Sequence, residues 1–332
     1  MAGAVLNPSE SHGRDNLTLA PREDSTTTAV ALGEGRTTLV VHERESCVPM
    51  ASTSVKTVPR RSSATVLTRA VHRRRMQLGA TVGGFYDRIG TTATAHGDGF
   101  EFLELSVGGD AVRIDEIDTT ALADRLDELG LDRTVHLPTV HPYAVPVTEI
   151  RRAALDYQTR ALDTAAALGA SKAVTHADTD PRDRGDETLL ADTVAELAAR
   201  GHERGVEVCV ENLGHLDKGF DIWTVGEAAA SAGVSLCLDI GHAYLEVGND
   251  GLDAFLGSHA DLVSHVHVHD ARERGDSHVP LGSGEVDPTA ATTLADHDPT
   301  VAVEVFTDDW RLLWDTAVRF RSAIRSEKTK LE

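Results

Sequence analysis

The sequence has little cysteine, little lysine and no long apolar segment. Its 332 residues include three cysteines, with no Cys-x-x-Cys pair, which excludes a disulfide-stapled secreted scaffold and a zinc ribbon. No run approaches the roughly 18 apolar residues of a membrane-spanning helix. Residues 1–30 lack the charged start and apolar stretch of a secretory signal. We therefore expect a soluble, cytoplasmic protein.

Basic residues are scarce relative to acidic ones. Lys and Arg total 32 against 53 Asp and Glu, a formal net charge of −21, and only five of the 32 are lysine. Residues 1–75 have a net charge of +4, which leaves −25 for residues 76–332. Such a surface disfavours nucleic acid as a partner. We interpret the acidic, lysine-poor composition as an adaptation to high salt, and hence as halophilic.

The N-terminal part differs from the rest of the chain. Residues 1–75 are rich in Ser, Thr and Arg and show no sustained helical or strand periodicity. They are interpreted as a disordered extension or as the result of a start codon placed too early, with Met76 the true first residue. Residues 326–332 are expected to form a short C-terminal tail.

From Met76 on, short apolar runs alternate with helical patterns. Eight runs rich in Val, Ile and Leu suit buried parallel strands, at 76–82, 100–106, 133–138, 172–177, 206–212, 234–240, 262–270 and 300–306. Helical patterns lie at 119–129, 148–168, 187–204, 224–232, 251–258, 289–296 and 309–325. Glycines that suit a left-handed helix end follow several of them, at Gly130, Gly169, Gly205 and Gly233.

This alternation predicts an α/β fold, a (β/α)8 TIM barrel over residues 76–325. Eight strand and helix pairs over about 250 residues are the size of such a barrel. An open doubly wound sheet would carry a Gly-rich fingerprint after its first strand, and none follows residues 76–82.

Acidic and imidazole side chains recur at the carboxyl ends of the predicted strands, where barrel active sites lie. They are Glu104, His136, His176, Glu211, Asp239, His265, His267, His269 and Glu304, with His242, Asp276 and His278 in the following loops. Burying so many carboxylates in one low-dielectric mouth would be costly without a cation. We therefore predict a divalent metal. Carboxylate and imidazole ligands suit Mn²⁺, Co²⁺ and Zn²⁺, and suit Mg²⁺ less well.

Strand parity indicates which side chains point into the barrel. Cys209 and Cys237 share parity with the acidic residues at the ends of their strands, so we expect packed core thiols. The three histidines at 265, 267 and 269 also share parity. Same-side residues are about 6.6 Å apart along a strand, so only one of the three suits a given ion. Spacing alone leaves open which one.

The motifs together resemble those of the xylose isomerase-like TIM barrel superfamily, from Met76 to about Ile324. That group contains sugar and sugar-phosphate isomerases and epimerases, inosose-processing enzymes and endonuclease IV. The matching segments are GFEFLELS, VHLP, VTHA, VCVENLG, CLDIGHAYLEVG, HVHVHD, HVPLGSGEVD and VEVF.

The resemblance implies a metal-dependent isomerase or epimerase of a sugar, sugar phosphate or keto-polyol. Its metal ligands would be Glu211, Asp239, His267 and Glu304. Here His267 is chosen because the family pattern has His three residues before an Asp. The two glutamates would also move protons through an ene-diolate. Substrate contacts are expected from Glu104, His136, His242, Gly282 and Gly284. A homo-oligomer is compatible with this interpretation.

An alternative is an endonuclease IV-like zinc phosphodiesterase that acts on abasic DNA with up to three zinc ions. Its additional ligands would be His136, His176, His242, Asp276 and His278. However, NLGHLDKG follows Glu211 where that family has a different run, and residues 76–332 lack a basic cluster. A third interpretation is a barrel that binds metal and a small molecule without turnover.

Overall fold

The computed structural model describes residues 76–83, 99–108, 112–139, 141–179, 187–213, 219–272, 275–307 and 309–331, and residues 27–32 and 36–41. The chain forms two units, Met1–Thr68 and Arg69–Glu332. In the first unit, β1 (Thr27–Leu32) pairs antiparallel with β2 (Arg36–Val41). The remainder of the N-terminal extension, for which we expected disorder, lies outside the described residues.

Eight parallel strands of the second unit close into a barrel in the order β12-β3-β4-β5-β6-β7-β8-β9. They are β3 (Leu78–Val82), β4 (Phe102–Ser106), β5 (Asp132–His136), β6 (Lys172–His176), β7 (Glu207–Glu211), β8 (Ser235–Asp239), β9 (Val263–Val268) and β12 (Thr300–Val303). Each overlaps one of the eight predicted runs. The predicted TIM barrel is therefore confirmed.

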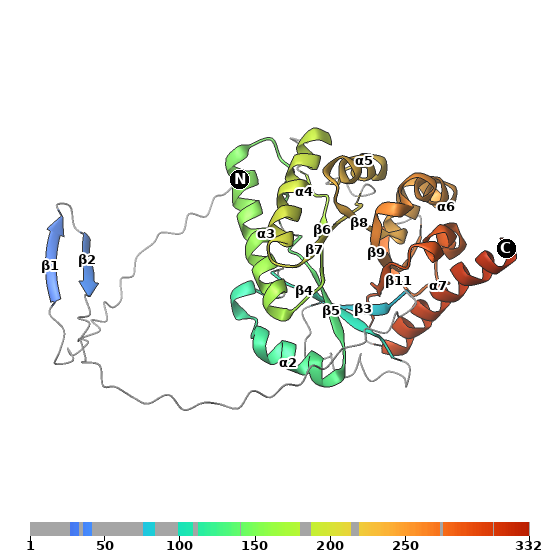
Figure 1. Cartoon of the computed structure of the whole chain (residues 1–332), viewed down its shortest axis with the longest axis horizontal. Coiled ribbons are helices and arrows are strands. Elements are labelled where there is room, and N and C mark those ends of the chain that lie inside the picture. The colour runs from blue at the N-terminus through green and yellow to red at the C-terminus, as the bar shows by residue number, and fades with distance from the viewer. Residues whose placement is uncertain are drawn as a thin grey trace, which may run out of the picture. The chain divides into compact units, whose positions relative to one another are not determined.

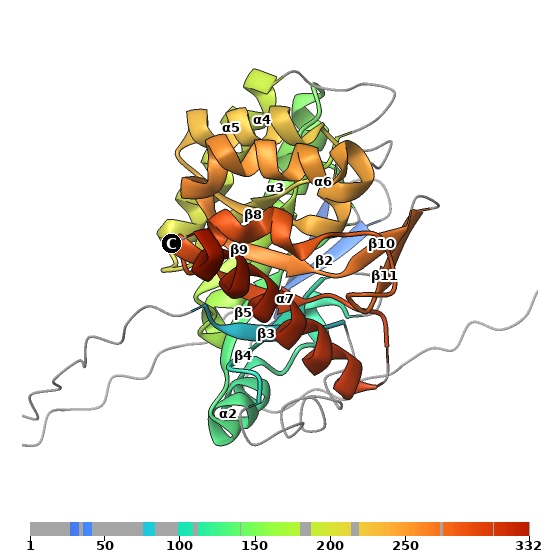
Figure 2. The ribbon, with the colours of Figure 1, turned by 90° about the vertical axis from the view of Figure 1, so that its right-hand side faces the viewer.

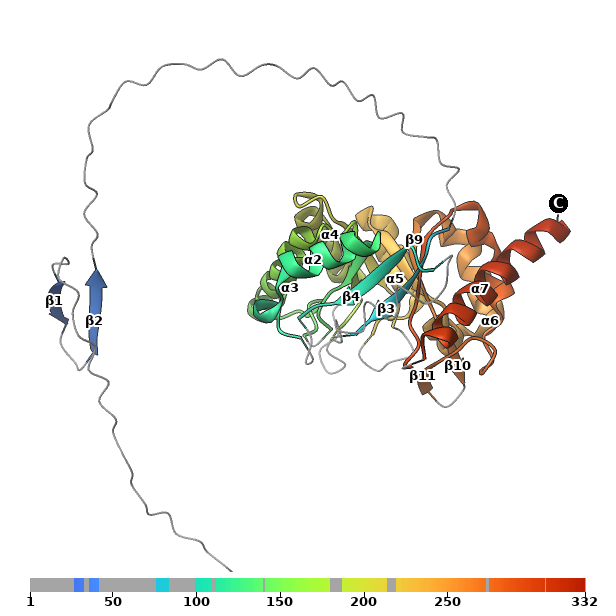
Figure 3. The same cartoon turned by 90° about the horizontal axis from the view of Figure 1, so that it is seen from below.

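Helices surround the barrel (Figures 1 and 3). They are α2 (Thr119–Leu129), α3 (Thr148–Leu168), α4 (Glu187–His202), α5 (Ile222–Ala232), α6 (Ile240–His259) and α7 (Trp310–Leu331). Short 3-10 helices are η2 (Ile114–Glu116), η3 (Ala260–Leu262) and η4 (Pro288–Asp296). The four predicted glycines have the positive φ of a left-handed helix end, between 65° and 73°. No described helix is long and apolar enough to cross a membrane.

Two helices are longer than their sequence patterns predict. The α6 segment includes a first helical stretch from Ile240 that the pattern does not predict, and the Asp239 carboxylate caps it by accepting the His242 backbone N–H at 2.7 Å. The non-helical backbone of Gly248 (φ 70°, ψ 178°) separates this stretch from the one that contains the predicted residues 251–258. Glycines within α6 hide its first stretch from a periodicity argument. Helix α7 continues to Leu331, through most of the expected tail.

A hairpin that the sequence analysis did not predict follows β9. Strand β10 (Asp270–Arg272) pairs antiparallel with β11 (Gly275–Val279), and Figure 2 shows the two strands projecting beyond one end of the barrel. The segment is charged and lacks an apolar alternation, which is the signal that sequence reasoning needs. The hairpin carries Asp276 and His278, so it matters for the site.

The interior of the barrel differs from the layer between the strands and the helices. That outer layer is a continuous apolar core, whereas the inside holds a small cluster of Val174, Cys209 and Cys237 beside buried polar groups. The expected packed core thiols are therefore observed at both cysteines, and burial raises the pKa of Cys209 to about 12. The buried polar groups inside the barrel form the candidate site.

Candidate metal centre

Strand register brings acidic and imidazole side chains together at the carboxyl ends of the barrel strands. Asp239 pairs with His267 across β8 and β9. Glu211, Asp239, His267 and Glu304 each offer a ligand atom, and the four atoms lie within 4.8 Å of one another. The Nδ1 atom of His267 is 3.1 Å from both Glu211 Oε1 and Glu304 Oε2. These are the four residues that the family resemblance selected, and we call them the primary group.

A second group of ligand atoms lies beside the primary group. It contains His242, His269, Asp276 and His278, again with ligand atoms within 4.8 Å of one another. His278 Nε2 lies 2.9 Å from Asp276 Oδ1, and His242 Nε2 lies 3.5 Å from Asp276 Oδ2. The two groups are adjacent, since His269 Nε2 is 3.0 Å from Asp239 Oδ1. We call this set the hairpin group, because two of its members come from β11.

Two further histidines face Oε2 of Glu211, the oxygen that His267 does not contact. His136 Nε2 and His176 Nε2 each lie 3.3 Å from Glu211 Oε2, and their rings meet edge to face. Strand pairing places His176 directly beside Glu211. Every residue that the sequence analysis named as an additional ligand therefore lies next to the primary group or in the hairpin group.

Backbone carbonyls fix the orientation of four of these imidazoles. The Nδ1 atoms of four rings lie 2.8–3.2 Å from carbonyl oxygens, namely His136 at Leu137, His242 at Asn212, His269 at Asp270 and His278 at Glu304. A carbonyl oxygen only accepts, so each Nδ1 carries the hydrogen. In the neutral ring, Nε2 then presents a lone pair to a carboxylate. Two facing acceptors repel each other unless a proton or a metal ion lies between them.

Carboxylate oxygens of the primary group also lack donors. Asp239 Oδ2 and Glu304 Oε2 are buried and receive no hydrogen bond from the described residues. Such orphaned acceptors are costly unless a cation compensates them. Together with the lone pairs on the imidazole nitrogens, this donor set fits a divalent ion of the kind that takes nitrogen and oxygen ligands.

The pKa shifts express the same charge balance. Burial alone would raise the pKa of Glu211, but the His267 and His176 imidazoles hold it well below its usual value. Burial alone would lower the pKa of His136 and His242, yet Glu211 beside the first and Asp239 beside the second raise both to about 9. The carboxylates beside His136 and His242 thus favour a positive charge at these two rings.

A cavity of about 290 Å³ opens onto this constellation. Among the predicted site residues, those that line it are His136, His176, Glu211, His242, Asp276, His278 and Glu304. Phe306, with 75% of its surface exposed, stacks on the His278 ring in the cavity wall. No Lys or Arg occurs among the described residues that line the cavity.

Glu104, which we expected to contact substrate, is not part of the cavity wall. Its side chain is fully buried beneath His267, with Oε1 2.8 Å from His267 Nε2 and Oε2 3.0 Å from His265 Nε2. Thr134 also donates to Oε2 at 3.1 Å. The Glu104 carboxylate therefore faces His267 of the primary group instead of the cavity.

Gly282 and Gly284, for which a substrate contact stays a prediction, belong to a turn held by Asp270. Their N–H groups both donate to Asp270 Oδ2 at 2.7 Å, while Asp270 Oδ1 accepts from Ala271 and Val286. Neither glycine lines the cavity. A Cβ at Gly284 would lie 2.4 Å from the Asp270 carboxylate, so glycine permits this close approach. Asp270, which we had noted only as part of a motif, fixes the turn.

Asn212 is a positioning residue that the sequence analysis missed. Its Oδ1 accepts the Asp239 backbone N–H at 2.9 Å, its Nδ2 donates to the Asp239 carbonyl at 3.1 Å, and its own carbonyl faces His242. The side chain thus ties β7 to β8 and orients two residues of the site. Its place directly after Glu211 was the only sequence signal.

With this geometry established, comparison with known proteins identifies the family. The chain belongs to the xylose isomerase-like TIM barrel family, whose model matches residues 93–324. A comparison with curated protein sequences gives no match.

Solved structures that resemble the barrel include sugar epimerases. A D-tagatose 3-epimerase-like protein is 17% identical, with a TM-score of 0.61, over 77% of this chain and 100% of that chain. L-ribulose 3-epimerase is 16% identical, with a TM-score of 0.62, over 77% and 98%. A protein from Thermus thermophilus, soaked with ZnCl2, is 23% identical, with a TM-score of 0.55, over 76% and 99%. At these identities the likeness shows a common fold.

Proposed function

We propose that this protein is a metal-dependent isomerase or epimerase that acts on a sugar or a related polyhydroxy ketone. The observation that carries the proposal is the primary group, in which two glutamates flank His267 and both line the cavity. The sugar epimerases among its structural relatives support the same reaction class.

In this proposal the two glutamates move the protons. Glu211 and Glu304 approach the bound sugar from different strands, so one removes a proton next to the substrate carbonyl and the other returns it on the opposite face. A divalent ion held by the primary group supplies Lewis acidity that favours the loss of this proton. His267 separates the two glutamates, and the imidazoles beside Glu211 keep it ionised and able to accept a proton.

The cavity favours a neutral sugar over a sugar phosphate. Recognition of a phosphate group normally uses Arg, Lys or a helix N-terminus. The described lining offers imidazoles, carboxylates and Phe306, and the His242 N–H in the first turn of α6 is already bound by Asp239. Hydroxyl groups of a ketose pair well with such acceptors and donors. We therefore expect a free ketose to be turned over with a higher kcat/KM than its phosphate ester.

The test is proton exchange in D₂O. Metal-loaded protein is incubated with D-tagatose, D-fructose or L-ribulose, and with the phosphate esters of these sugars. NMR then reads the epimer or aldose formed and the deuterium at the reacting carbon. We expect turnover with deuterium incorporation for the wild type and its loss in Glu304→Gln and Glu211→Gln. Near-normal rates in either variant contradict the glutamate mechanism.

A matched control separates catalysis from folding. Asp287→Asn makes the same carboxylate-to-amide change at an exposed cap of η4, where Asp287 accepts from Thr289 at 2.9 Å. This variant should retain full turnover. A wild-type protein that binds one metal ion and exchanges no proton with any sugar would favour a barrel that binds without turnover.

The hairpin group favours a second candidate, a multinuclear phosphodiesterase of the endonuclease IV type. Its ligand atoms, with His136 and His176 beside Glu211, exceed what one ion needs. The absence of Lys and Arg from the described lining and the acidic chain argue against a DNA backbone as substrate. Elemental analysis decides between the candidates: about one metal per chain supports the isomerase, while two or three zinc ions with cleavage of an abasic duplex support the nuclease.

A further inference from the structure

A column of polar side chains runs inside the barrel from His267 through Glu104, His265 and Thr300 to Lys172. His267 and Glu104 form its end next to the primary group. The Nε2 atom of His267 is 2.8 Å from Glu104 Oε1, and its Nδ1 atom faces the glutamates of the primary group. Both ring nitrogens therefore face carboxylates, and a metal ion that took the lone pair of Nδ1 would leave the hydrogen on Nε2, on the side of Glu104. Glu104 is thus the carboxylate that would accept the Nε2 hydrogen of a His267 bound to metal through Nδ1.

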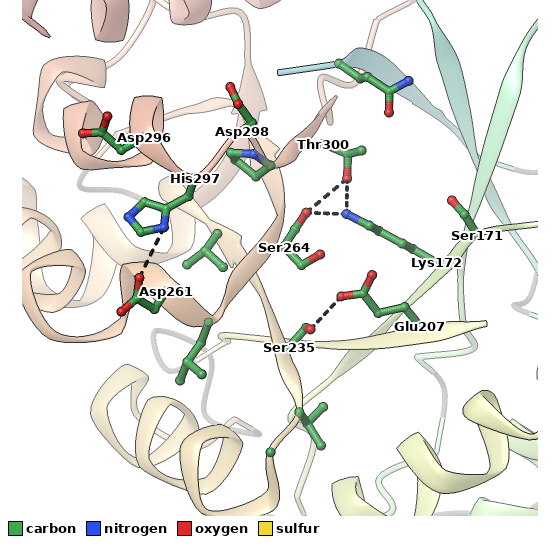
Figure 4. Close-up of a pocket in the computed structure, with 16 residues that line it drawn as sticks. Ser171, Lys172, Glu207, Ser235, Asp261, Ser264, Asp296, His297, Asp298 and Thr300 are labelled. Carbon is green, nitrogen blue, oxygen red and sulfur yellow. Dashed lines mark hydrogen bonds and ion pairs between the residues drawn. The ribbon is translucent and has the colours of Figure 1, made fainter. Parts of the chain in front are cut away.

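The column continues to the amino-terminal end of the barrel. On the far side of Glu104, His265 Nε2 lies 3.0 Å from Oε2, and His265 Nδ1 lies 2.6 Å from Thr300 Oγ1. Lys172 Nζ then donates to Thr300 Oγ1 at 3.0 Å and to the Ser264 carbonyl at 2.5 Å. Figure 4 shows this lower end, where Lys172 and Thr300 line a cavity of about 790 Å³ at the starts of the strands.

The polar contacts of the column run without a break from Lys172 to Glu104. Lys172 can only donate, which makes Thr300 Oγ1 an acceptor from it. The single Thr300 hydroxyl hydrogen has two neighbouring acceptors, the Ser264 carbonyl at 3.3 Å and His265 Nδ1 at 2.6 Å, and His265 Nε2 faces Glu104 Oε2. Glu104 accepts hydrogen bonds from Thr134 at 3.1 Å and from Thr81 at 3.4 Å, and the Nε2 atoms of His265 and His267 lie within 3.0 Å of its oxygens. A carboxylate held by several donors in a dry interior has little freedom to rotate.

We propose that Glu104 is a positioning residue that holds His267 in the tautomer and ring orientation needed to ligate the metal, and that the chain from Lys172 through Thr300 and His265 anchors Glu104. The inference rests on the proposed metal-dependent function. It assigns no substrate contact to Glu104. Carboxylate partners of ligating histidines typically change metal affinity by about 10–100-fold when they are replaced.

The test measures Zn²⁺ affinity by competition with a chromophoric chelator, with no sugar present. In Glu104→Gln, the Kd for Zn²⁺ should rise roughly 10–100-fold. Thr300→Val, which interrupts the column two hydrogen bonds away, should raise the Kd by a smaller factor. The control is Glu246→Gln on α6, a half-buried carboxylate that accepts the Ile222 N–H outside the site at 2.9 Å; it should leave the Kd unchanged.

A spectroscopic readout separates positioning from a merely structural role. The zinc-loaded wild type should show a downfield imidazole N–H proton that Glu104→Gln shifts upfield and His267→Gln abolishes, because that proton lies between His267 and Glu104. An unchanged signal together with an unchanged Kd in folded Glu104→Gln overturns the proposal. If that variant does not fold, an unchanged Kd in Thr300→Val overturns the anchoring chain.

The result also separates this inference from the proposed function. Equal zinc affinity in the wild type and Glu104→Gln refutes positioning and leaves the sugar reaction standing. A wild type that fails to bind zinc, manganese or cobalt refutes both. A wild type that binds metal and shows the Glu104 effect without any sugar turnover supports positioning and refutes the isomerase.

Discussion

Replacing Asp270 by asparagine should destabilise the protein strongly, although the side chain keeps its shape. The Asp270 carboxylate is fully buried and accepts four backbone N–H groups, from Ala271, Gly282, Gly284 and Val286, at 2.7–3.0 Å. Asparagine offers one acceptor oxygen and turns the other position into an NH₂ donor. Two of the four N–H groups, either the buried pair of Ala271 and Val286 or the part-buried pair of Gly282 and Gly284, then face a donor.

The size of the effect follows from those two lost acceptors. Each unsatisfied buried donor costs about 1–3 kcal/mol, so Asp270→Asn should lower the free energy of unfolding by about 4 kcal/mol. For a domain of this size that corresponds to a decrease in Tm of roughly 10 °C. Urea denaturation followed by circular dichroism measures it. The matched control is Asp315→Asn, which breaks an exposed pair with Arg319 at 2.6 Å and should cost less than about 1 kcal/mol.

A decrease below about 1 kcal/mol in Asp270→Asn would refute this reasoning. It would mean that water reaches the turn or that the backbone relaxes enough to satisfy its amides elsewhere. A large decrease in the free energy of unfolding in both variants would also contradict the reasoning, because the exposed Asp315 carboxylate would then contribute as much as the buried Asp270.

Three further predictions test other parts of the structure. Asp221 caps α5, and hydrogen bonds from Thr224 lower the pKa of its carboxyl group although burial alone would raise it. The stabilisation from this cap is therefore present above about pH 4 and is lost as pH falls through the lowered pKa. Asp221→Ala should cost about 1 kcal/mol at neutral pH, measured by urea denaturation at pH 7 and pH 3. Gly241→Ala should destabilise the fold by about 1–3 kcal/mol, because the added Cβ would lie 2.1 Å from the His269 ring. The control is Gly257→Ala in the same segment, whose Cβ would meet no atom within 4 Å; it should be neutral or stabilising in the same measurement. Zn²⁺ or Mn²⁺ at about 100 times its Kd should stabilise the fold by about 2.7 kcal/mol, and a calorimetric Tm that a chelator leaves unchanged contradicts the metal centre.

Much of the fold was accessible from the sequence because the period of the apolar pattern is a local property. Short runs of Val, Ile and Leu suit buried parallel strands whatever their neighbours are, and all eight overlap observed strands. The part of α6 before Gly248 escaped this reasoning, since Gly241 and Gly248 interrupt the pattern and a contact of Asp239 with the first turn starts the helix, whereas the predicted residues 251–258 are helical. The β10–β11 hairpin escaped it because pairing between two charged segments leaves no apolar signature.

The sequence by itself determined most of the residues that gather at the mouth, because parallel strands of one barrel present their carboxyl ends on the same side; Glu104 and His265, also expected there, lie deeper in the barrel. Only the tertiary structure decided how the three histidines of β9 and its extension divide their roles. His265 faces Glu104 and Thr300, His267 faces Glu211 and Glu304, and His269 faces Asp239. They share parity along the strand, so the neighbours that distinguish them lie on other strands. Those neighbours are fixed by barrel closure and register, which no local pattern encodes.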